Sequence, residues 1–246
     1  GNTHNGKSSC FIDPAFAVDG NRVYMMVDLW PGGYALNGAN HSPIAGQNGF
    51  DADGNLRLTD VLQNNSSSVQ YNYHLVQKEN PTVEDYYEIR RNSDNSVVEG
   101  YTIDAYYNLK SENDNTNLFY WDSPFKVYPT NYLWVNHSDD GGKTWSLPTL
   151  ANVKFASEQT FLVAPGTGLV VEKPDGIKRI MFTGYEFTSG DRNSWVIYSD
   201  DGGLTWNRGA KCSGWSSEST ITQVGEKIYI FTRHGVCYYI SDDYGE

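Results

Sequence analysis

One short motif occurs three times in the sequence, and this repeat limits the possible folds more than any other feature. Its complete copies cover residues 138–145 and 199–206, and both follow the pattern Ser-x-Asp-x-Gly-x-Thr-Trp. A third copy runs from Ser241 to Glu246 without the Thr-Trp pair. The aspartate of this pattern can accept hydrogen bonds from the amides of its own turn, and the glycine tolerates a positive φ. Each copy therefore predicts a tight turn, under which the tryptophan packs.

Each copy follows a run of aromatic and β-branched residues, which is typical of a β-strand. These runs cover residues 132–135, 195–198 and 236–240. Two further strand-like runs precede each of them, at residues 11–18 and 22–29, 168–172 and 179–187, and 219–223 and 227–233. Short turns, such as Asp19-Gly20 and Gly225-Glu226, separate the members of each pair. Four antiparallel strands with the motif between the third and the fourth make one blade of a propeller.

A long segment interrupts the first of these units between its second and third strands. It is rich in Asn, Ser and Tyr and does not repeat the blade pattern. We therefore expect three parts: strands one and two of the first blade at residues 1–33, an inserted β-rich lobe at 34–121, and the remainder of the first blade with two further blades at 122–246. Closed propellers have about 4–8 blades, so about three blades indicate part of a larger propeller.

The composition excludes several classes of function. With 18 Lys and Arg against 30 Asp and Glu, the 246 residues carry a formal net charge of −12. Nucleic acids and anionic membrane surfaces bind basic faces, so neither is an expected partner. No apolar run reaches the ~18 residues of a membrane span. The three cysteines are widely spaced and form no zinc-ligand pattern, so we expect no metal and no cofactor.

Several segments, taken with the repeats, resemble bacterial sialidases, which are exo-α-sialidases (neuraminidases) with Asp-box repeats. Phe11-Ile12-Asp13-Pro14 and the long insertion in a blade are similar to features of that family. The segment Ser217-Glu218-Ser219-Thr220 resembles the strand that carries the family's catalytic glutamate, and residues 231–235 resemble the strand end that carries one of its three arginines. The resemblance implies an all-β, six-bladed sialidase-type propeller, of which this chain is similar to the central part.

The resemblance also implies roles for individual residues. Sialic acid carries a carboxylate that would repel a carboxylate nucleophile, and sialidases use a tyrosine instead. A tyrosine needs a base to activate it, and the resemblance assigns that role to Glu218. It makes Arg233 one of the guanidinium groups that bind the substrate carboxylate. Asp13 would accept a hydrogen bond from the acetamido group, and Ile12 and Trp30 would line the acetyl pocket.

Residue spacing supports part of this site without the resemblance. If Gly225-Glu226 is a two-residue turn, Glu218 lies directly opposite Arg233 in the hairpin. The alternative is a cross-strand ion pair with a structural role only. Asp13 stands about as far before its own turn as Glu218 does, so we expect both at one end of the blades. Tyr185 flanks a turn at the same end and is expected to contact the glycerol tail or the aglycone.

We therefore expect a sialidase that hydrolyses terminal α-linked sialic acid from glycoproteins, gangliosides and oligosaccharides with retention. The acid, the nucleophile and two arginines of that family have no counterpart in this sequence, so the isolated chain is expected to be a poor enzyme that needs the remaining propeller segments. Two alternatives stay open: a non-catalytic sialoglycan-binding or scaffold propeller, and an intramolecular trans-sialidase. Because such glycans lie outside cells, the expected location is extracellular or on the surface of a bacterium.

Overall fold

The fold is all-β, as predicted. The structure is a computed structural model that describes residues 8–32, 48–61, 69–188, 191–234 and 237–246. Its contacts divide the chain into two compact units. The lobe unit comprises Gly1–Cys10 and Trp30–Thr130, and the propeller unit comprises Phe11–Leu29 and Asn131–Glu246. The boundaries expected at residues 34 and 121 stay a prediction, and residue 34 lies outside the described residues.

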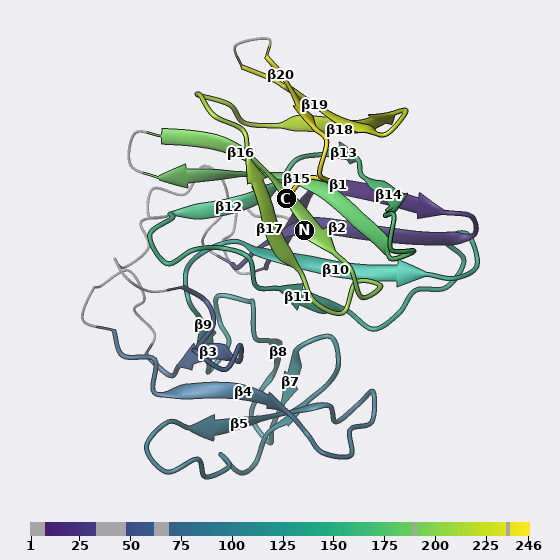
Figure 1. Cartoon of the computed structure of the whole chain (residues 1–246). Helices are drawn as coiled ribbons and strands as arrows, with labels where there is room; N and C mark the ends of the chain where they lie inside the picture. The colour runs from purple at the N-terminus through teal and green to yellow at the C-terminus, as the bar shows by residue number, and fades with distance from the viewer. Residues whose placement is uncertain (1–7, 33–47, 62–68, 189–190, 235–236) are drawn as a thin grey trace. The chain divides into compact units, whose positions relative to one another are not determined.

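The first blade forms across the interruption in the sequence. Its strands are β1 (Cys10–Asp19), β2 (Arg22–Trp30), β10 (Tyr132–Ser138) and β11 (Thr149–Ala151), in the order β11-β10-β2-β1 (Figure 1). Strands β2 and β10 pair antiparallel from Tyr132 opposite Leu29 to Ser138 opposite Val23. The motif at residues 138–145 then leads from the third strand to the fourth, as expected for a blade.

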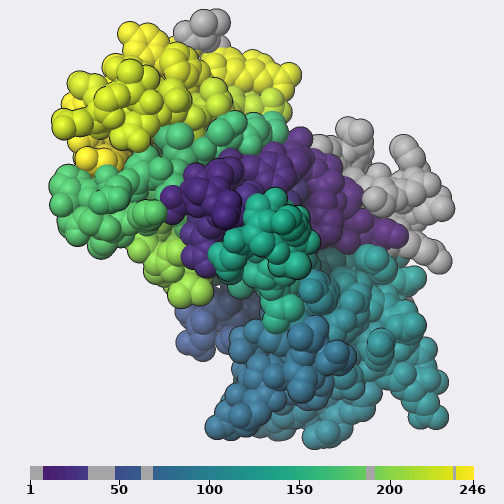
Figure 2. Space-filling view, turned by 90° about the vertical axis from the view of Figure 1, so that its right-hand side faces the viewer, coloured from purple at the N-terminus to yellow at the C-terminus, as the bar shows by residue number. Residues whose placement is uncertain are grey.

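The second and third blades repeat this order. The second consists of β14 (Leu169–Glu172), β15 (Lys178–Thr188), β16 (Asp191–Ser199) and β17 (Asn207–Lys211), and the third of β18 (Ser219–Val224), β19 (Lys227–Thr232) and β20 (Tyr238–Ser241). Val236, which the sequence assigned to the last strand, lies outside the described residues. In Figure 2 the third blade (yellow) lies against the second (green).

The sequence analysis missed both β12 and the short β13, which precede β14 in the second blade. The first strand of the second blade is split, because β12 (Thr160–Val163) also pairs with β15, opposite its residues 184–187. Between β12 and β14 the backbone turns away at β13 (Gly166–Thr167) and pairs in parallel with Ala15 and Phe16 of β1. A run of only four residues before a Pro-Gly break carries too little periodicity to be recognised as a strand.

The blades bury apolar residues between their sheets. Tyr24, Met26 and Leu133 of the first blade pack with Phe161 and Phe182 of the second in one cluster. A second cluster joins the second blade to the third through Val171, Met181, Val196, Ile221, Ile228 and Ile230. Alternate residues of each strand thus face a neighbouring blade, because successive side chains of a β-strand point to opposite faces of the sheet.

The repeated motif folds as predicted. Asp140 accepts hydrogen bonds from the amides of Lys143 and Thr144, each at 2.9 Å, and from the Thr144 hydroxyl at 2.7 Å. These bonds lower the pKa of the Asp140 carboxyl to about 2. Gly141 and Gly142 have φ values of 73° and 89°, which only glycine adopts without strain. The repeated aspartates are therefore structural.

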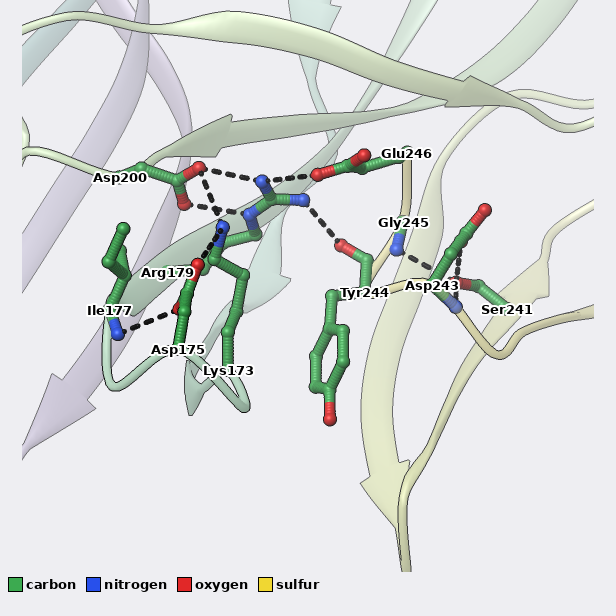
Figure 3. Close-up of polar contacts among 10 residues, drawn as sticks. All are labelled: Lys173, Asp175, Ile177, Arg179, Asp200, Ser241, Asp243, Tyr244, Gly245 and Glu246. Carbon is green, nitrogen blue, oxygen red and sulfur yellow. Dashed lines mark hydrogen bonds and ion pairs between the residues drawn. The ribbon is translucent and has the colours of Figure 1, made fainter.

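The third copy of the motif is held against the second blade by a buried cation. The Arg179 side chain donates to Asp200 from Nε at 2.7 Å and from Nη2 at 2.6 Å, and also to the Tyr244 carbonyl at 3.0 Å and Glu246 at 2.9 Å (Figure 3). Its guanidinium carbon lies 3.9 Å from the centroid of the Tyr198 ring. A buried guanidinium needs such partners, since an unpaired one would be strongly destabilising.

The lobe unit is an antiparallel sheet in the order β8-β7-β6-β5-β4-β3-β9. Its strands are β3 (Leu56–Thr59), β4 (Tyr73–Gln77), β5 (Tyr87–Arg91), β6 (Thr102–Ile103), β7 (Asn108–Lys110), β8 (Asn115–Asn117) and β9 (Lys126–Val127). Aromatic rings supply much of its packing, and those of Tyr87 and Tyr107 stack with centroids 5.1 Å apart. Among the described residues of the chain, no helix has the length and hydropathy to cross a membrane.

Candidate active site

The hairpin of the third blade has the register expected from its turn. Pairing runs from Ser219 opposite Thr232 to Val224 opposite Lys227, which leaves Gly225-Glu226 as the two-residue turn. Gly225 has a φ of 60°, as the first position of a type II′ turn requires. The predicted opposition of Glu218 and Arg233 is therefore confirmed.

Glu218 and Arg233 contact each other just beyond the end of this ladder. The amide of Arg233 donates to the Glu218 carbonyl at 2.8 Å, and its guanidinium Nη1 contacts the Glu218 carboxylate. The Arg233 side chain is 63% exposed and that of Glu218 is 31% exposed. An ion pair this open to water adds little to stability, so both groups are available to a ligand. Their catalytic and binding roles stay predictions.

Asp13 lies in β1 in a strained backbone conformation. Its φ is 57°, in the left-handed region that few residues other than glycine adopt. The following Pro14 narrows the allowed backbone of Asp13 further. Backbone strain of this kind costs of the order of 1–3 kcal/mol and clusters at functional sites. Burial raises the pKa of the Asp13 carboxyl, and the nearby negative charge of Glu218 raises it further.

Tyr185 is buried near the end of β15 and lies among these charged groups. Burial is the main cause that raises the pKa of its hydroxyl, followed by the electrostatic effects of the nearby Asp28, Glu218 and Asp13 carboxyl groups. The positive charge of Arg192 acts in the opposite direction on the pKa of Tyr185. The structure therefore brings Tyr185, Glu218 and Asp13 together from three different blades. Contact of Tyr185 with a substrate stays a prediction.

Ile12 and Trp30 occupy different surroundings. Ile12 is half-buried in β1, next to the strained Asp13. Trp30 is buried at the end of β2. Their assignment to an acetyl pocket stays a prediction. Among the described residues, no group of three or more His, Cys, Asp or Glu side chains could hold a metal ion.

Asp28 is an ionisable residue in this region that the sequence analysis did not identify as part of the site. It is fully buried in β2, and its Oδ1 accepts from the Val163 amide at 3.1 Å and from Asn131 Nδ2 at 3.4 Å. Its Oδ2 has no hydrogen-bond partner within the described part of the chain. Burial raises the pKa of Asp28 well above its ordinary value, which favours the neutral form of its carboxyl. The signal was a single aspartate within a run of apolar residues, since a buried polar group needs a compensating partner.

The contacts of Asp28 reach the strand next to Tyr185. Asn131 accepts from the Phe161 amide at 3.1 Å and donates to its carbonyl at 2.5 Å. Asp28 and Asn131 together therefore fasten β12 to the first blade. Leu162 of β12 pairs with Tyr185. This buried polar pair thus sets the position of Tyr185 from the far side of β12.

The blades and this cluster define a segment of an all-β propeller with a polar, partly strained site at one end of its blades. The chain is 30% identical over 227 residues to sialidase B of Streptococcus pneumoniae, which covers 84% of this chain and 31% of that protein. It is 27% identical over 218 residues to the anhydrosialidase of Macrobdella decora, over 81% of this chain and 28% of that protein. No family model matches the chain.

Solved structures agree with this relationship. The intramolecular trans-sialidase from Ruminococcus gnavus superposes with a TM-score of 0.75 at 25% identity, over 98% of this chain and 53% of that chain. The chain is therefore homologous to the sialidases and resembles the central part of their catalytic propeller, as its motifs predicted. It spans about a third of the length of the curated relatives it matches, 31% and 28%.

Proposed function

We propose that this chain forms part of the catalytic propeller of a retaining exo-α-sialidase that acts on terminal α-linked sialic acid. The proposal rests chiefly on the Glu218–Arg233 pair, which stands at the open end of its hairpin beside Asp13 and Tyr185. The exposed guanidinium of Arg233 suits a ligand that itself carries a carboxylate, and the hairpin register holds Glu218 next to it.

In this proposal, Glu218 takes the proton of a nucleophilic tyrosine that another part of the propeller supplies. The tyrosine oxygen bonds to the anomeric carbon while the bond to the leaving oxygen breaks, and an acid protonates that oxygen. Water then attacks the anomeric carbon while the bond to the tyrosine oxygen breaks; the conjugate base of the acid takes a proton from the water, and Glu218 returns its proton to the tyrosine. Sialic acid is thereby released with retention. Arg233 binds the substrate carboxylate through its guanidinium fork and thereby leaves Glu218 to act as the base.

The remaining residues are proposed to orient the sugar. Asp13 accepts a hydrogen bond from the acetamido N–H, and Ile12 and Trp30 line the pocket for the acetyl methyl group. Tyr185 contacts the glycerol tail. The natural substrates are then sialylated glycans on glycoproteins, gangliosides and oligosaccharides, and because these lie outside cells we propose an extracellular or cell-surface location on a bacterium.

The test is hydrolysis of a fluorogenic α-sialoside by the whole protein that contains this chain. Glu218→Gln should lower kcat about 100-fold or more with little change in KM, because general-base catalysis contributes at least that factor. Arg233→Lys should chiefly raise KM, since it keeps the charge but loses the fork. Leu204→Ala, at an exposed position in the second motif turn, is the control and should behave as the parent. Binding of a sialoside without any turnover by the parent would instead favour a non-catalytic glycan-binding propeller.

A second candidate function is intramolecular trans-sialidase activity. It is favoured by two of the similar proteins, the anhydrosialidase of Macrobdella decora and the intramolecular trans-sialidase from Ruminococcus gnavus. The two reactions differ in the group that attacks the sialyl intermediate, which is water in one and a hydroxyl of the same sugar in the other. Mass spectrometry of the product distinguishes them, because the anhydro sugar is lighter than sialic acid by one water.

A further inference from the structure

An exposed indole lies beside the candidate active site, and none of the roles above uses it. Trp215 stands in the loop between β17 and β18 and is 53% exposed. The His234 ring contacts it, with centroids 4.6 Å apart and planes inclined by 51°. On the same ring, the guanidinium carbon of Arg192 lies 5.5 Å from the centroid. The exposed indole, the half-buried imidazole of His234 and the half-buried guanidinium of Arg192 come from three separate segments and form one cluster, which we call the Trp215 platform.

The loop that carries Trp215 is fastened on both sides of the indole. The amide of Cys212 donates to the Ser194 carbonyl at 2.8 Å, and the amide of Ser216 donates to the Arg192 carbonyl at 3.0 Å. The buried Ser194 completes the attachment, because its amide donates to Ser216 Oγ at 2.9 Å and its hydroxyl donates to the Ser217 carbonyl at 2.5 Å. Trp215 is thus exposed on a backbone that buried hydrogen bonds hold in place, which preorganises it for binding.

Each member of the platform adjoins a residue of the proposed site. Trp215 precedes Glu218 by three residues in the same loop, and His234 directly follows Arg233. Arg192 lies close enough to Tyr185 for its charge to affect that hydroxyl. A molecule held by Glu218, Arg233 and Tyr185 would therefore have its outward-pointing part next to the indole.

We propose that the Trp215 platform binds the neutral sugar to which the sialic acid is linked, so that it recognises the leaving group; this inference rests on the proposed function. The face of an indole carries negative charge density, so it attracts C–H groups and repels carboxylates. One face of a pyranose ring presents C–H groups, whereas its hydroxyls lie at the rim. Arg192 supplies donors and His234 supplies ring nitrogens to those hydroxyls, since both groups contact the same indole.

The experiment compares two substrates of the whole protein that differ only in the leaving group. 3′-Sialyllactose has a sugar next to the sialic acid, and methyl α-sialoside has none. Trp215→Ala should lower kcat/KM for 3′-sialyllactose about tenfold, as the loss of a stacking contact of ordinary strength would, and should leave that for methyl α-sialoside within about twofold. Trp215→Phe should fall between, because it keeps a smaller ring. Leu204→Ala is the matched control, an exposed apolar side chain in the turn that follows the other end of β16.

The outcomes separate this inference from the proposed function. Equal losses on the two substrates, or no loss on 3′-sialyllactose, would overturn the platform while the sialidase activity stands. If the parent cleaves neither substrate, the proposed sialidase function is wrong. Calorimetric measurement of the binding of 3′-sialyllactose and of free sialic acid then tests the platform by itself. Weaker binding of 3′-sialyllactose alone to Trp215→Ala would support the platform. Unchanged binding, or no binding by the parent, would overturn it. Thermal unfolding of each variant shows that the fold is retained.

Discussion

At the residue scale, the propeller unit buries several carboxyl groups whose protonation is set by their surroundings. Burial raises the pKa of Asp28 and so favours its neutral form, although two hydrogen bonds to one of its oxygens act in the opposite direction. Glu158 is buried beside Arg208 and Glu186, and the three side chains share hydrogen bonds. Of these two glutamates, burial raises the pKa of Glu158 to about 7, whereas hydrogen bonds outweigh burial and lower the pKa of Glu186. Glu158 is therefore the member of this pair that takes up a proton first as the pH falls.

We expect the carboxyl of Asp28 to be neutral, and this predicts how substitutions there behave. Asp28→Asn should change the free energy of unfolding by less than ~1 kcal/mol, because a neutral carboxyl and an amide have the same shape and the carbonyl oxygen still accepts from Val163. Asp28→Ala should cost about 1–3 kcal/mol, because it leaves a buried amide unpaired. Denaturant unfolding measures both. A loss in Asp28→Asn as large as that in Asp28→Ala would mean that the carboxyl is ionised.

Glu158 predicts a dependence of stability on pH. Its folded pKa of about 7 lies above the ordinary value of 4.5, so the folded state holds a proton that the unfolded state releases between these values. Its contribution to stability is thus fully present below about pH 4.5 and is lost as the pH rises through 7. The thermal midpoint of the parent should fall over this range, and the fall should be smaller in Glu158→Gln. Parallel curves for the two proteins would contradict this account.

At the element scale, the motif turns have the same hydrogen bonds, although their tryptophans differ in burial. In all three copies the serine hydroxyl donates to the aspartate two positions on and accepts from an amide four positions on. These bonds lie within six residues, so each turn forms wherever the pattern occurs. The tryptophans differ, since Trp206 is 8% exposed and Trp145 is 40% exposed. Trp206 packs with buried residues of the first two blades, whereas Trp145 does not belong to that cluster.

The two tryptophans form a matched pair for a test. In the 246-residue chain, Trp206→Ala should cost about 3–5 kcal/mol, because it removes a large side chain from the core. Trp145→Ala should cost less than ~1 kcal/mol there, since water already reaches its ring. In the whole protein we expect the cost of Trp145→Ala to rise toward that of Trp206→Ala, because another blade would cover it. The measurement is the free energy of unfolding of both variants, in the 246-residue chain and in the whole protein. A small cost for Trp145→Ala in both proteins would mean that no blade covers this face of the first blade.

At the scale of the whole molecule, the two outer faces of the three-blade segment are apolar. The first blade exposes Phe11, Phe16 and Val18, and the third exposes Val224, Phe231, Tyr238 and Ile240. The opposite face of each of these two blades packs against the second blade. A blade with two apolar faces buries both of them only when it lies between two other blades, as in a closed propeller. The share of its relatives that the chain covers, 31% and 28%, agrees with this interpretation.

The sequence by itself determined those features of the fold and the site that depend on residues close together in the chain. The motif turns, the four-strand order of a blade and the opposition of Glu218 and Arg233 follow from residues within one turn or one hairpin, where period and turn length set the register. The resemblance to sialidases also rested on such short segments. Local patterning was sufficient there because each element forms from neighbouring residues.

Only the tertiary structure decided the rest. Asp28 and Val163 are 135 positions apart, and no local pattern indicates that they meet. The split strand at β12, the strained Asp13 and the Trp215 platform likewise depend on separate segments brought together. Their positions come from packing of one blade against the next, which fixes side chains through burial and hydrogen bonds that the sequence does not order along the chain.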